Sequence, residues 1–481
     1  MMKRLYINCY VLLMLLSAPV LTSCQWFDVG NESEIDENDM FGNADGFYTA
    51  LTGIYLNMCS TNLYGGNLSL TALEPLTQQY SVSENDPDRI EWMKFNYTTD
   101  YAQKTVGNIW LTMYNTIANA NMLLDKMDGA KGMIDDDVVN MMRGETLGLR
   151  ALMYFDLVRM FNDIYAVSPA SDNVPFKTDF GLSLGKKVTS EVLLDSISSH
   201  LRQSRKLLAS DPIKTGMATQ NRYLRYDRTQ RMNYYAVTAL LARVELYRAN
   251  YKDAATYAQE VIENSKFRFI RPEEVLQTDA YGVELKSDRI FTSEMVFALY
   301  CENILTTSRS YYEGLSQDFA KSTNAYEDSD VRMAWFYKNP SANGKINMIR
   351  YQRSQRSQDA DKYNDPLVPI LKISEMYLIL AECNLMGATT NSTAVEYINE
   401  VKSHRCTSEV AKSASEETLW TELTHEYICD FKGEGQLFFY YKRRNMQSVD
   451  DGNSNGNSVT VPASAYVLPL PDYEKQFGYG K

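Results

Sequence analysis

A mostly α-helical fold is predicted by three features of the sequence. Apolar residues recur three and four residues apart in several long segments, a spacing that places them on one face of a helix. Two of these segments are followed by a short break and a second helical pattern, as in a helical hairpin. Strand-like runs are short and lie in segments rich in Asn, Ser, Asp and Gly, which is typical of loops. We therefore expect a helical scaffold that carries large loop-rich insertions.

The first two helices are expected at 44–58 and 107–127. In the first, Phe47 and Leu51 begin an apolar face that continues at the same spacing to the end of the segment. In the second, Trp110 begins a similar face. Both patterns are amphipathic, so each helix is expected to pack one face against the rest of the protein.

A third helix is expected to begin near the acidic run 135–137, because these residues offer a cap and a favourable charge at a helix N-terminus. It includes 145–161, which is apolar most of the way round. Such a helix is predicted to be buried between other helices. A fourth helix is expected at 190–208.

Two segments resemble tetratricopeptide helical hairpins, in which small residues lie at the helix contacts. The first is 234–264, with a break at Ala249 and Asn250. The second is 373–405, about 140 residues further on. Hairpins so far apart do not make a contiguous solenoid, and we expect repeats interleaved with insertions. The two large polar insertions are 61–101 and 266–365, and the second contains a strand-like run at 295–300.

The start of the chain predicts an exported lipoprotein. Lys3 and Arg4 precede an apolar run that is too short to span a bilayer, as in a secretory signal peptide. The run ends in Leu-Thr-Ser-Cys, which resembles a bacterial lipobox, so Cys24 is the expected lipidation site. The alternative is a soluble secreted protein with a coincidental cysteine. An acidic segment follows Cys24 and is expected to be a flexible tether.

Composition excludes some functions. The formal net charge is -13, and removal of the two cations of the signal peptide makes it about -15, which argues against nucleic-acid binding. Five cysteines remain besides those of the signal and the lipobox, an odd number that excludes a complete disulfide framework. Only three histidines occur, and none lies at metal-ligand spacing from another.

No catalytic residue, metal ligand or cofactor is predicted. His425 and Glu426 begin a zinc-protease-like pattern, but Cys429 stands where the second histidine is needed. Three histidines offer no good Ser-His-Asp triad. Paired carboxylates for glycoside hydrolysis stay an open alternative, since their separation is spatial. Two acidic runs, 84–88 and 359–365, lack the EF-hand spacing and are interpreted as solvated loops.

Aromatic and polar residues in the two insertions are the candidate ligand contacts. An exposed ring can cover an apolar face of a ligand, and polar side chains can bind its hydrogen-bonding groups. Trp92 is the strongest single candidate, with packing in the interior as the alternative. Tyr311 and Tyr312 are adjacent in a polar context, so at least one is expected to face water. The candidate set is Trp92, Tyr64, Tyr80, Asn85, Arg89, Tyr281, Tyr311, Tyr312 and Trp335.

Six segments, in order along the chain, resemble the SusD/RagB family of outer-membrane glycan-binding lipoproteins. One departure is Gln436, where arginine is usual, which puts the packing of that helix in doubt. The resembling segments are the lipobox at Cys24, IWLTMYNTIANANMLLD (109–125), LRALMYFDLVRMFNDI (149–164), ISEMYLILAECN (373–384), THEYICDFKGEGQLFFYYKRRN (424–445) and YVLPLPDYE (466–474).

The resemblance implies a binding protein and not an enzyme. Members sit on the cell surface, anchored by lipid in the outer membrane, and pair with a TonB-dependent, SusC-like transporter to which they deliver oligosaccharide or sometimes peptide. A peptide-binding member, a non-catalytic scaffold and a glycoside hydrolase are the alternatives. The expected parts are a signal peptide (1–23), a lipidated leader (24–40), an N-terminal helical part with a ligand-loop insertion (41–265) and a C-terminal part with the helical pair 373–405 (266–481).

Overall fold

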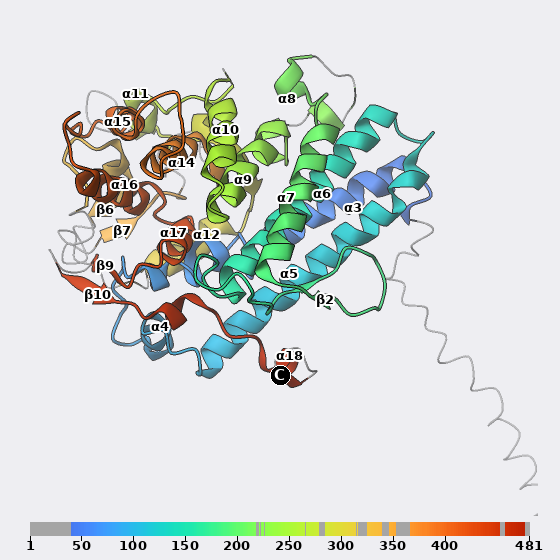
Figure 1. Cartoon of the computed structure of the whole chain (residues 1–481), viewed down its shortest axis with the longest axis horizontal. Coiled ribbons are helices and arrows are strands. Elements are labelled where there is room, and N and C mark those ends of the chain that lie inside the picture. The colour runs from blue at the N-terminus through green and yellow to red at the C-terminus, as the bar shows by residue number, and fades with distance from the viewer. Residues whose placement is uncertain are drawn as a thin grey trace, which may run out of the picture.

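Helices form most of the computed structural model (Figure 1). The structure describes residues 40–217, 221, 223–225, 227–264, 266–278, 284–313, 315, 325–338, 346–352, 366–452 and 457–476. Cys24, the signal peptide and nearly all of the leader lie outside the described residues. No described helix is both long enough and apolar enough to cross a membrane.

The helices expected near 44–58, 107–127, 135–161, 190–208, 234–264 and 373–405 are all present, although the second begins at Asp100, while α12 (Ile304–Glu313) and α16 (Glu416–Asp430) were not expected. Asn43, Thr99, Thr189 and Asn233 each cap the helix that follows, with a side-chain oxygen that accepts a backbone N–H. The main helices are α3 (Ala44–Met58), α5 (Asp100–Lys126), α6 (Asp136–Phe161), α7 (Ser190–Leu207), α9 (Tyr234–Tyr247), α10 (Tyr251–Ile262), α12 (Ile304–Glu313), α14 (Ile373–Leu385), α15 (Ala394–His404), α16 (Glu416–Asp430) and α17 (Gln436–Arg443).

Shorter turns of helix occur between the long helices. Short α-helices are α4 (Pro87–Met93), α8 (Pro212–Thr215), α11 (Pro272–Val275) and α18 (Asp472–Gln476). Single turns of 3₁₀ or π-helix are η2 (Asn67–Thr71), η3 (Pro75–Thr77), η4 (Met127–Ala130), η5 (Tyr223–Arg225), η6 (Arg228–Gln230), η7 (Thr292–Glu294), η8 (Val331–Trp335) and η11 (Ala463–Tyr466). The insertions therefore contain more helix than the sequence indicated, above all at α4 and α12.

The strands form small antiparallel pairs. The longest pair, β5 (Met295–Tyr300) with β8 (Leu367–Lys372), confirms the strand-like run at 295–300. Both strands are almost wholly buried beside the helical hairpins. The other pairs are β1 (Pro175–Phe176) with β2 (Lys186–Lys187), β3 (Gln277–Thr278) with β4 (Glu284–Lys286), β6 (Phe336–Lys338) with β7 (Ile346–Met348), and β9 (Ser448–Asp450) with β10 (Ser458–Thr460).

Helix α6 is buried along nearly its whole length, as its apolar sequence predicts. Asp135 is its N-cap residue, but the Asp135 side chain makes no capping hydrogen bond. The expected cap is therefore absent. What remains at this end is the favourable charge of Asp136 and Asp137 in the first turn.

The two helical hairpins are neighbours in space, although they are far apart in sequence. Helix α9 packs on α10, α10 on α14, and α14 on α15, so the four helices make one continuous array (Figure 1). This corrects the expectation that the two pairs are not contiguous. The chain between α10 and α14 leaves the array and returns to it. On the other side, α9 contacts α7, which continues through α6 and α5 to α3.

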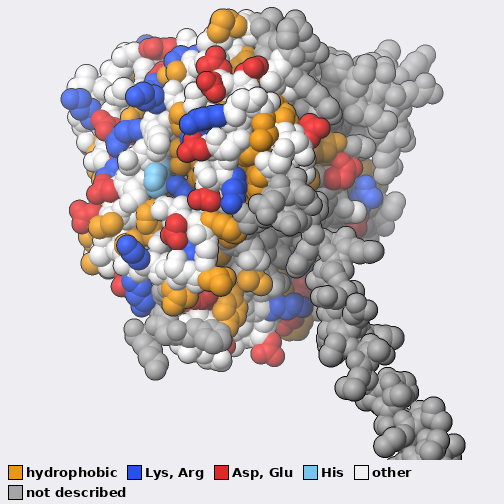
Figure 2. Space-filling model, turned by 90° about the vertical axis from the view of Figure 1, so that its right-hand side faces the viewer, with side chains coloured by type: hydrophobic (Ala, Val, Ile, Leu, Met, Phe, Trp, Pro, Cys, Tyr) orange, Lys and Arg blue, Asp and Glu red, His pale blue; other side chains and the backbone are white. Residues whose placement is uncertain are grey.

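One cluster of buried apolar residues runs through the molecule, from Phe47 near the start of α3 to Leu468 near the end of the chain. The parts 41–265 and 266–481 therefore share a core, and the boundary between them stays a prediction. On the face seen in Figure 2, acidic and basic side chains are interspersed, with separate groups of hydrophobic ones between them.

A network of buried ion pairs joins the C-terminal helices to β8. The carboxylate of Asp430 accepts hydrogen bonds from Arg405 Nε (2.9 Å), Lys372 Nζ (3.0 Å) and Ser374 Oγ (2.7 Å). Arg332 lies 3.5 Å from Asp430 and 2.9 Å from Glu426. All of these side chains are almost completely buried. The network links β8, α14, α16 and the loop after α15.

Candidate functional site

The two polar insertions meet at a cluster of three tyrosines. Tyr80 follows η3 in the first insertion, and Tyr311 and Tyr312 lie on α12 in the second. The ring of Tyr80 is 6.1 Å from that of Tyr311 and 6.2 Å from that of Tyr312, measured between centroids. Tyr311 and Tyr312 are 5.1 Å apart in an edge-to-face arrangement. The structure thus brings together candidate residues from both insertions.

A buried carboxylate anchors this cluster to the loop between α16 and α17. Glu74 accepts hydrogen bonds from the Tyr80 hydroxyl (2.7 Å) and from the backbone N–H groups of Gly433 and Gly435 (2.8 Å each). Burial raises the pKa of Glu74, while these three donors act in the opposite direction. The two glycine N–H groups form a concave cradle for the carboxylate.

This cradle requires glycine. Gly433 and Gly435 have φ angles of 81° and 69°, in the left-handed region that side chains with a Cβ disfavour. A Cβ on Gly435 would also lie 1.8 Å from the carbonyl oxygen of Leu68. The Lys-Gly-Glu-Gly run at 432–435 therefore has a local structural role that candidate-site reasoning from the sequence missed. Its two closely spaced glycines were the available signal.

Two cations lie against the tyrosine rings. The guanidinium carbon of Arg89 is 5.2 Å from the centroid of Tyr311, and the ammonium nitrogen of Lys432 is 5.0 Å from that of Tyr80. Burial lowers the pKa of Lys432. Arg89 Nη1 and the hydroxyls of Tyr311 and Tyr312 are buried and have no hydrogen-bond partner within the described part of the chain.

The N-terminus of α4 forms a partly exposed rim beside this cluster. Asp86 caps the helix by accepting from the backbone N–H of Arg89 (3.1 Å), and the Arg89 Nε lies 3.4 Å from the Asp86 carboxylate. The Arg89 side chain is 19% exposed. Asn85 is exposed one residue before the cap. Two of the predicted contacts, Asn85 and Arg89, are therefore accessible to a ligand.

The aromatic candidates are buried. The expectation that Tyr311 or Tyr312 faces water is wrong, since each is 2% exposed. Trp92 is completely buried, and its indole N–H donates to the Ala72 carbonyl (2.8 Å). Tyr64 donates to Asp156 (2.6 Å) from the interior. Trp92 packs against residues nearby in sequence, Tyr97 and Tyr101, whereas Tyr64 reaches Asp156 on α6, 92 residues further on.

Trp335 is also completely buried, with the Arg350 guanidinium 4.2 Å from its ring centroid. It therefore presents no free ring face. Tyr281 lies outside the described residues. Of the nine candidates, the structure gathers Tyr80, Arg89, Tyr311 and Tyr312 into one cluster with Asn85 at its rim, and it places Trp92, Tyr64 and Trp335 in the protein interior.

Within the residues that the structure places, no group of three or more His, Cys, Asp or Glu side chains could hold a metal ion. The acidic run at 84–88 provides the cap and the first turn of α4 through Asp86 and Asp88. The run 359–365 falls outside the described ranges. His425 Nε2 lies 2.7 Å from the Ala325 carbonyl and 3.7 Å from Cys429 Sγ. Burial raises the pKa of this thiol, which disfavours a reactive thiolate.

Comparison with known protein families gives two matches that together cover most of the chain. Residues 26–246 match a family of SusD-like proteins described as starch-binding and associating with the outer membrane. Residues 216–466 match the SusD family. The chain is also 24% identical over 269 residues to the SusD-like protein P2 of Formosa agariphila, a match that spans 55% of this chain and 47% of that relative.

Solved structures share the fold over almost the whole of their length. A SusD superfamily protein from Bacteroides thetaiotaomicron has a TM-score of 0.69 at 22% identity and matches 90% of this chain and 98% of its own. A putative sugar-binding protein from Bacteroides vulgatus has a TM-score of 0.68 at 22% identity, over 90% and 96% of the two chains.

A SusD-like carbohydrate-binding protein from Bacteroides vulgatus has a TM-score of 0.67 at 16% identity and matches 90% of this chain and 96% of its own. At these identities the structural likeness establishes the fold alone. The match of the family model to more than half of the sequence, together with this fold, establishes the family. The chain belongs to the SusD family.

Proposed function

We propose that this protein is a non-catalytic, surface-exposed lipoprotein that binds a glycan and delivers it to a TonB-dependent, SusC-like transporter. The observation that carries the proposal is the meeting of the two insertions at Tyr80, Tyr311 and Tyr312, next to the exposed rim of α4. Membership of the SusD family, whose matched relatives include proteins described as carbohydrate-binding, supports the choice of a glycan.

In this proposal the rim binds the ligand and the tyrosines form a rigid floor. Asn85 and Arg89 offer hydrogen-bond donors to sugar hydroxyls, and Arg89 is held in place by Asp86 and by the ring of Tyr311. The Arg89 side chain is 19% exposed, so a ligand oxygen can approach it from the solvent side. Pre-ordered side chains lose less entropy when a ligand binds.

Replacing Arg89 with alanine is expected to weaken glycan binding roughly tenfold or more, because a hydrogen bond to a charged group typically contributes about 1.5–3 kcal/mol. Isothermal titration calorimetry against a panel of oligosaccharides would measure the change. Arg143→Ala is the matched control, since Arg143 is also a mostly buried arginine, 25% exposed, that pairs with one aspartate. It lies on α6, outside the candidate cluster, and should keep the wild-type affinity.

Each other outcome points to a different alternative. Equal affinity of the Arg89→Ala and wild-type proteins would remove Arg89 from the site. Binding of peptides but of no glycan would favour a peptide-binding member of the family. Release of reducing sugar from polysaccharides would indicate a hydrolase, and co-purification of a transporter without any ligand binding would favour a scaffold.

The lipid anchor is proposed on the sequence alone, since Cys24 lies outside the described residues. Cys24→Ala is expected to abolish retention at the cell surface while it leaves the melting temperature and ligand affinity of the folded part unchanged. Fractionation of cells and calorimetry on the purified protein would measure these effects. A lower melting temperature in the variant would show that the leader belongs to the folded part.

A further inference from the structure

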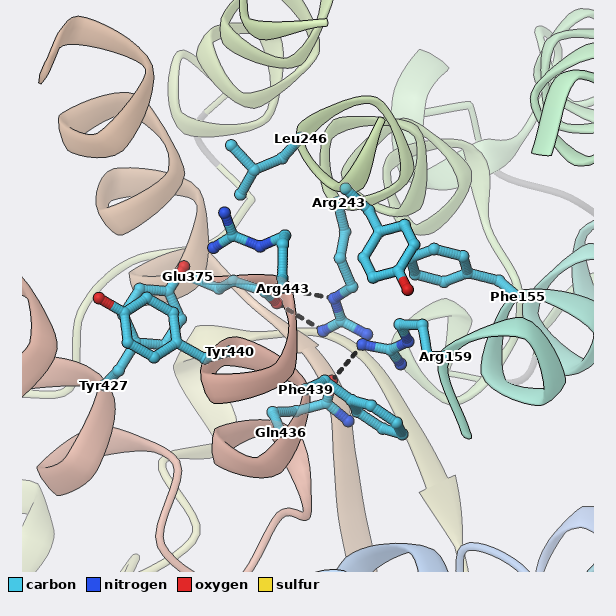
Figure 3. Close-up of a pocket in the computed structure, with 11 residues that line it drawn as sticks. Phe155, Arg159, Arg243, Leu246, Glu375, Tyr427, Gln436, Phe439, Tyr440 and Arg443 are labelled. Atoms are coloured by element: carbon cyan, nitrogen blue, oxygen red, sulfur yellow. Dashed lines mark hydrogen bonds and ion pairs between the residues drawn. The ribbon is translucent and has the colours of Figure 1, made fainter. Parts of the chain in front are cut away.

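A small cavity lies where helices from the two halves of the chain meet. It is lined by residues of α6, α9, α14, α16 and α17, among them Phe155, Arg159, Arg243 and Arg443 (Figure 3). Its volume is about 30 Å³. A volume of this size holds roughly two water molecules or one small ion. It lies outside the tyrosine cluster, and no residue of that cluster lines it.

Three buried hydrogen-bond donors in the cavity wall lack an acceptor. They are Arg159 Nε, Arg243 Nη1 and the O–H of Tyr247, and none has an acceptor in the described ranges. The Tyr247 oxygen itself is approached by the backbone N–H of Tyr165. Each of the three residues is at least 94% buried. Arginine side chains can only donate hydrogen bonds. A hydrogen-bond acceptor is therefore missing from this part of the cavity wall. Unsatisfied buried donors are costly, which makes three around one cavity unusual.

The remaining donors of both arginines are held by the protein. Arg243 binds Glu375 through Nε and Nη2 (2.5 Å each) and also donates to the Ile370 carbonyl (2.6 Å). Arg159 donates to Gln436 (3.1 Å) and pairs with Asp156. Both guanidinium groups are therefore fixed in orientation, and the dashed lines in Figure 3 mark the contacts to Glu375 and Gln436.

The charges of the wall favour an anion. Three guanidinium groups line the cavity, those of Arg159, Arg243 and Arg443, and Glu375 is its one carboxylate. The acidic partners of Arg159 and Arg443, which are Asp156 and Glu382, do not line it. Burial lowers the pKa of Arg159, and the nearby Arg243 cation lowers it further. Asp156 has the opposite effect and raises this pKa. An anion between the two guanidinium groups would offset their repulsion.

We infer that this cavity binds one monovalent anion of halide size, which accepts hydrogen bonds from Arg159, Arg243 and Tyr247. The volume is too small for a sugar and favours a halide over sulfate or phosphate. Its position links α6 and α9 to α14 and α17, so the bound anion stabilises the junction between the two halves. This site is independent of the proposed glycan site and does not rest on it.

Crystals of the mature chain grown in sodium bromide test the site directly. We expect an anomalous bromide peak within hydrogen-bond distance of Arg159 Nε and Arg243 Nη1. Density in the cavity with no anomalous signal would mean that it holds only water, and that result would overturn the inference.

Thermal unfolding gives a second readout in solution. The melting temperature should rise with chloride to a plateau when chloride replaces gluconate at constant ionic strength and pH. Tyr247→Phe removes one donor and keeps the ring, and we expect it to raise the half-saturating chloride concentration roughly threefold to tenfold. Tyr441→Phe is the matched control, because the Tyr441 hydroxyl is also buried without a partner in the described structure but does not line the cavity.

The control variant should respond to chloride like the wild-type protein. Equal melting temperatures of the wild-type protein in chloride and gluconate would contradict the inference, as would an equal loss of chloride dependence in both variants.

Discussion

Replacing Asp430 with alanine is expected to lower the free energy of unfolding by about 3–5 kcal/mol, because it leaves buried cations without their shared counter-charge. Asp430 is completely buried and accepts from Arg405, Lys372 and Ser374, with Arg332 3.5 Å away. Chemical denaturation monitored by circular dichroism would measure the loss.

The matched control for this network is Asp128→Ala. Asp128 also binds two cations, Lys131 and Arg143 at 3.0 Å each, but its side chain is 74% exposed. Exposed ion pairs are screened by water and contribute little, so the control should unfold close to the wild-type midpoint. An equal effect of both substitutions would mean that the buried network does not hold the C-terminal helices to β8.

The effect of Asp430→Ala also has a defined pH dependence. Burial alone would raise the pKa of Asp430, but Arg405, Lys372 and Arg332 hold this pKa well below its usual range. A carboxyl group with a depressed folded-state pKa stabilises the protein above its unfolded pKa of about 3.9, and the contribution is lost as the pH falls through the folded value. The difference between wild type and variant should therefore be constant near neutral pH and shrink below about pH 4.

Replacing Trp92 with alanine is expected to cost about 3–5 kcal/mol of stability, the range typical of large aromatic residues removed from a core. Trp92 is completely buried, donates to the Ala72 carbonyl and packs against the rings of Tyr97 and Tyr101 at 5.2 and 6.1 Å. If Trp92 were an exposed ligand contact, as the sequence suggests, the same substitution would weaken glycan binding without unfolding the protein. Because Trp92 is buried in the last turn of α4, the structure instead predicts a loss of stability.

Trp420→Ala separates this effect from the general loss of a tryptophan. Trp420 is only partly buried and stacks with Arg444, 3.7 Å from its ring centroid. Urea titrations of both variants should show a much larger shift of the midpoint for Trp92→Ala. If Trp92→Ala instead kept the wild-type midpoint and lost glycan affinity, Trp92 would be a ligand contact after all.

The helices could be predicted because their signal is local. The spacing of Phe47 and Leu51 or the caps at Asn43 and Asn233 can be read within one helical turn. The candidate site could be predicted only in part, since exposure depends on partners that are distant in sequence. The charged residues next to Trp92 in the sequence suggest that its ring is exposed to solvent. The ring is buried, and its indole N–H donates to the carbonyl of Ala72, 20 residues earlier in the chain.

Tyr311 and Tyr312 show the same limit more strongly. Their polar sequence context predicts a loop, but they lie on α12, and both rings are buried. Glu74, which organises the cluster through Tyr80, is held by two glycines about 360 residues away in the chain. No local pattern carries that pairing. That the insertions carry the binding residues stays a prediction, based on the fact that loops on a rigid scaffold commonly do so.

The contact between α10 and α14 has a consequence for how the insertion can change in evolution. The chain leaves the array at Ile262 and returns at Ile373, so about 110 residues are joined to it at both ends by helices that pack on each other. The entropy of closing a flexible loop grows only with the logarithm of its length, about 0.6 kcal/mol for each doubling. Loops within this part can therefore lengthen or shorten at little cost to the array, whereas β5, β8 and the buried Arg332 belong to the shared core and must be kept.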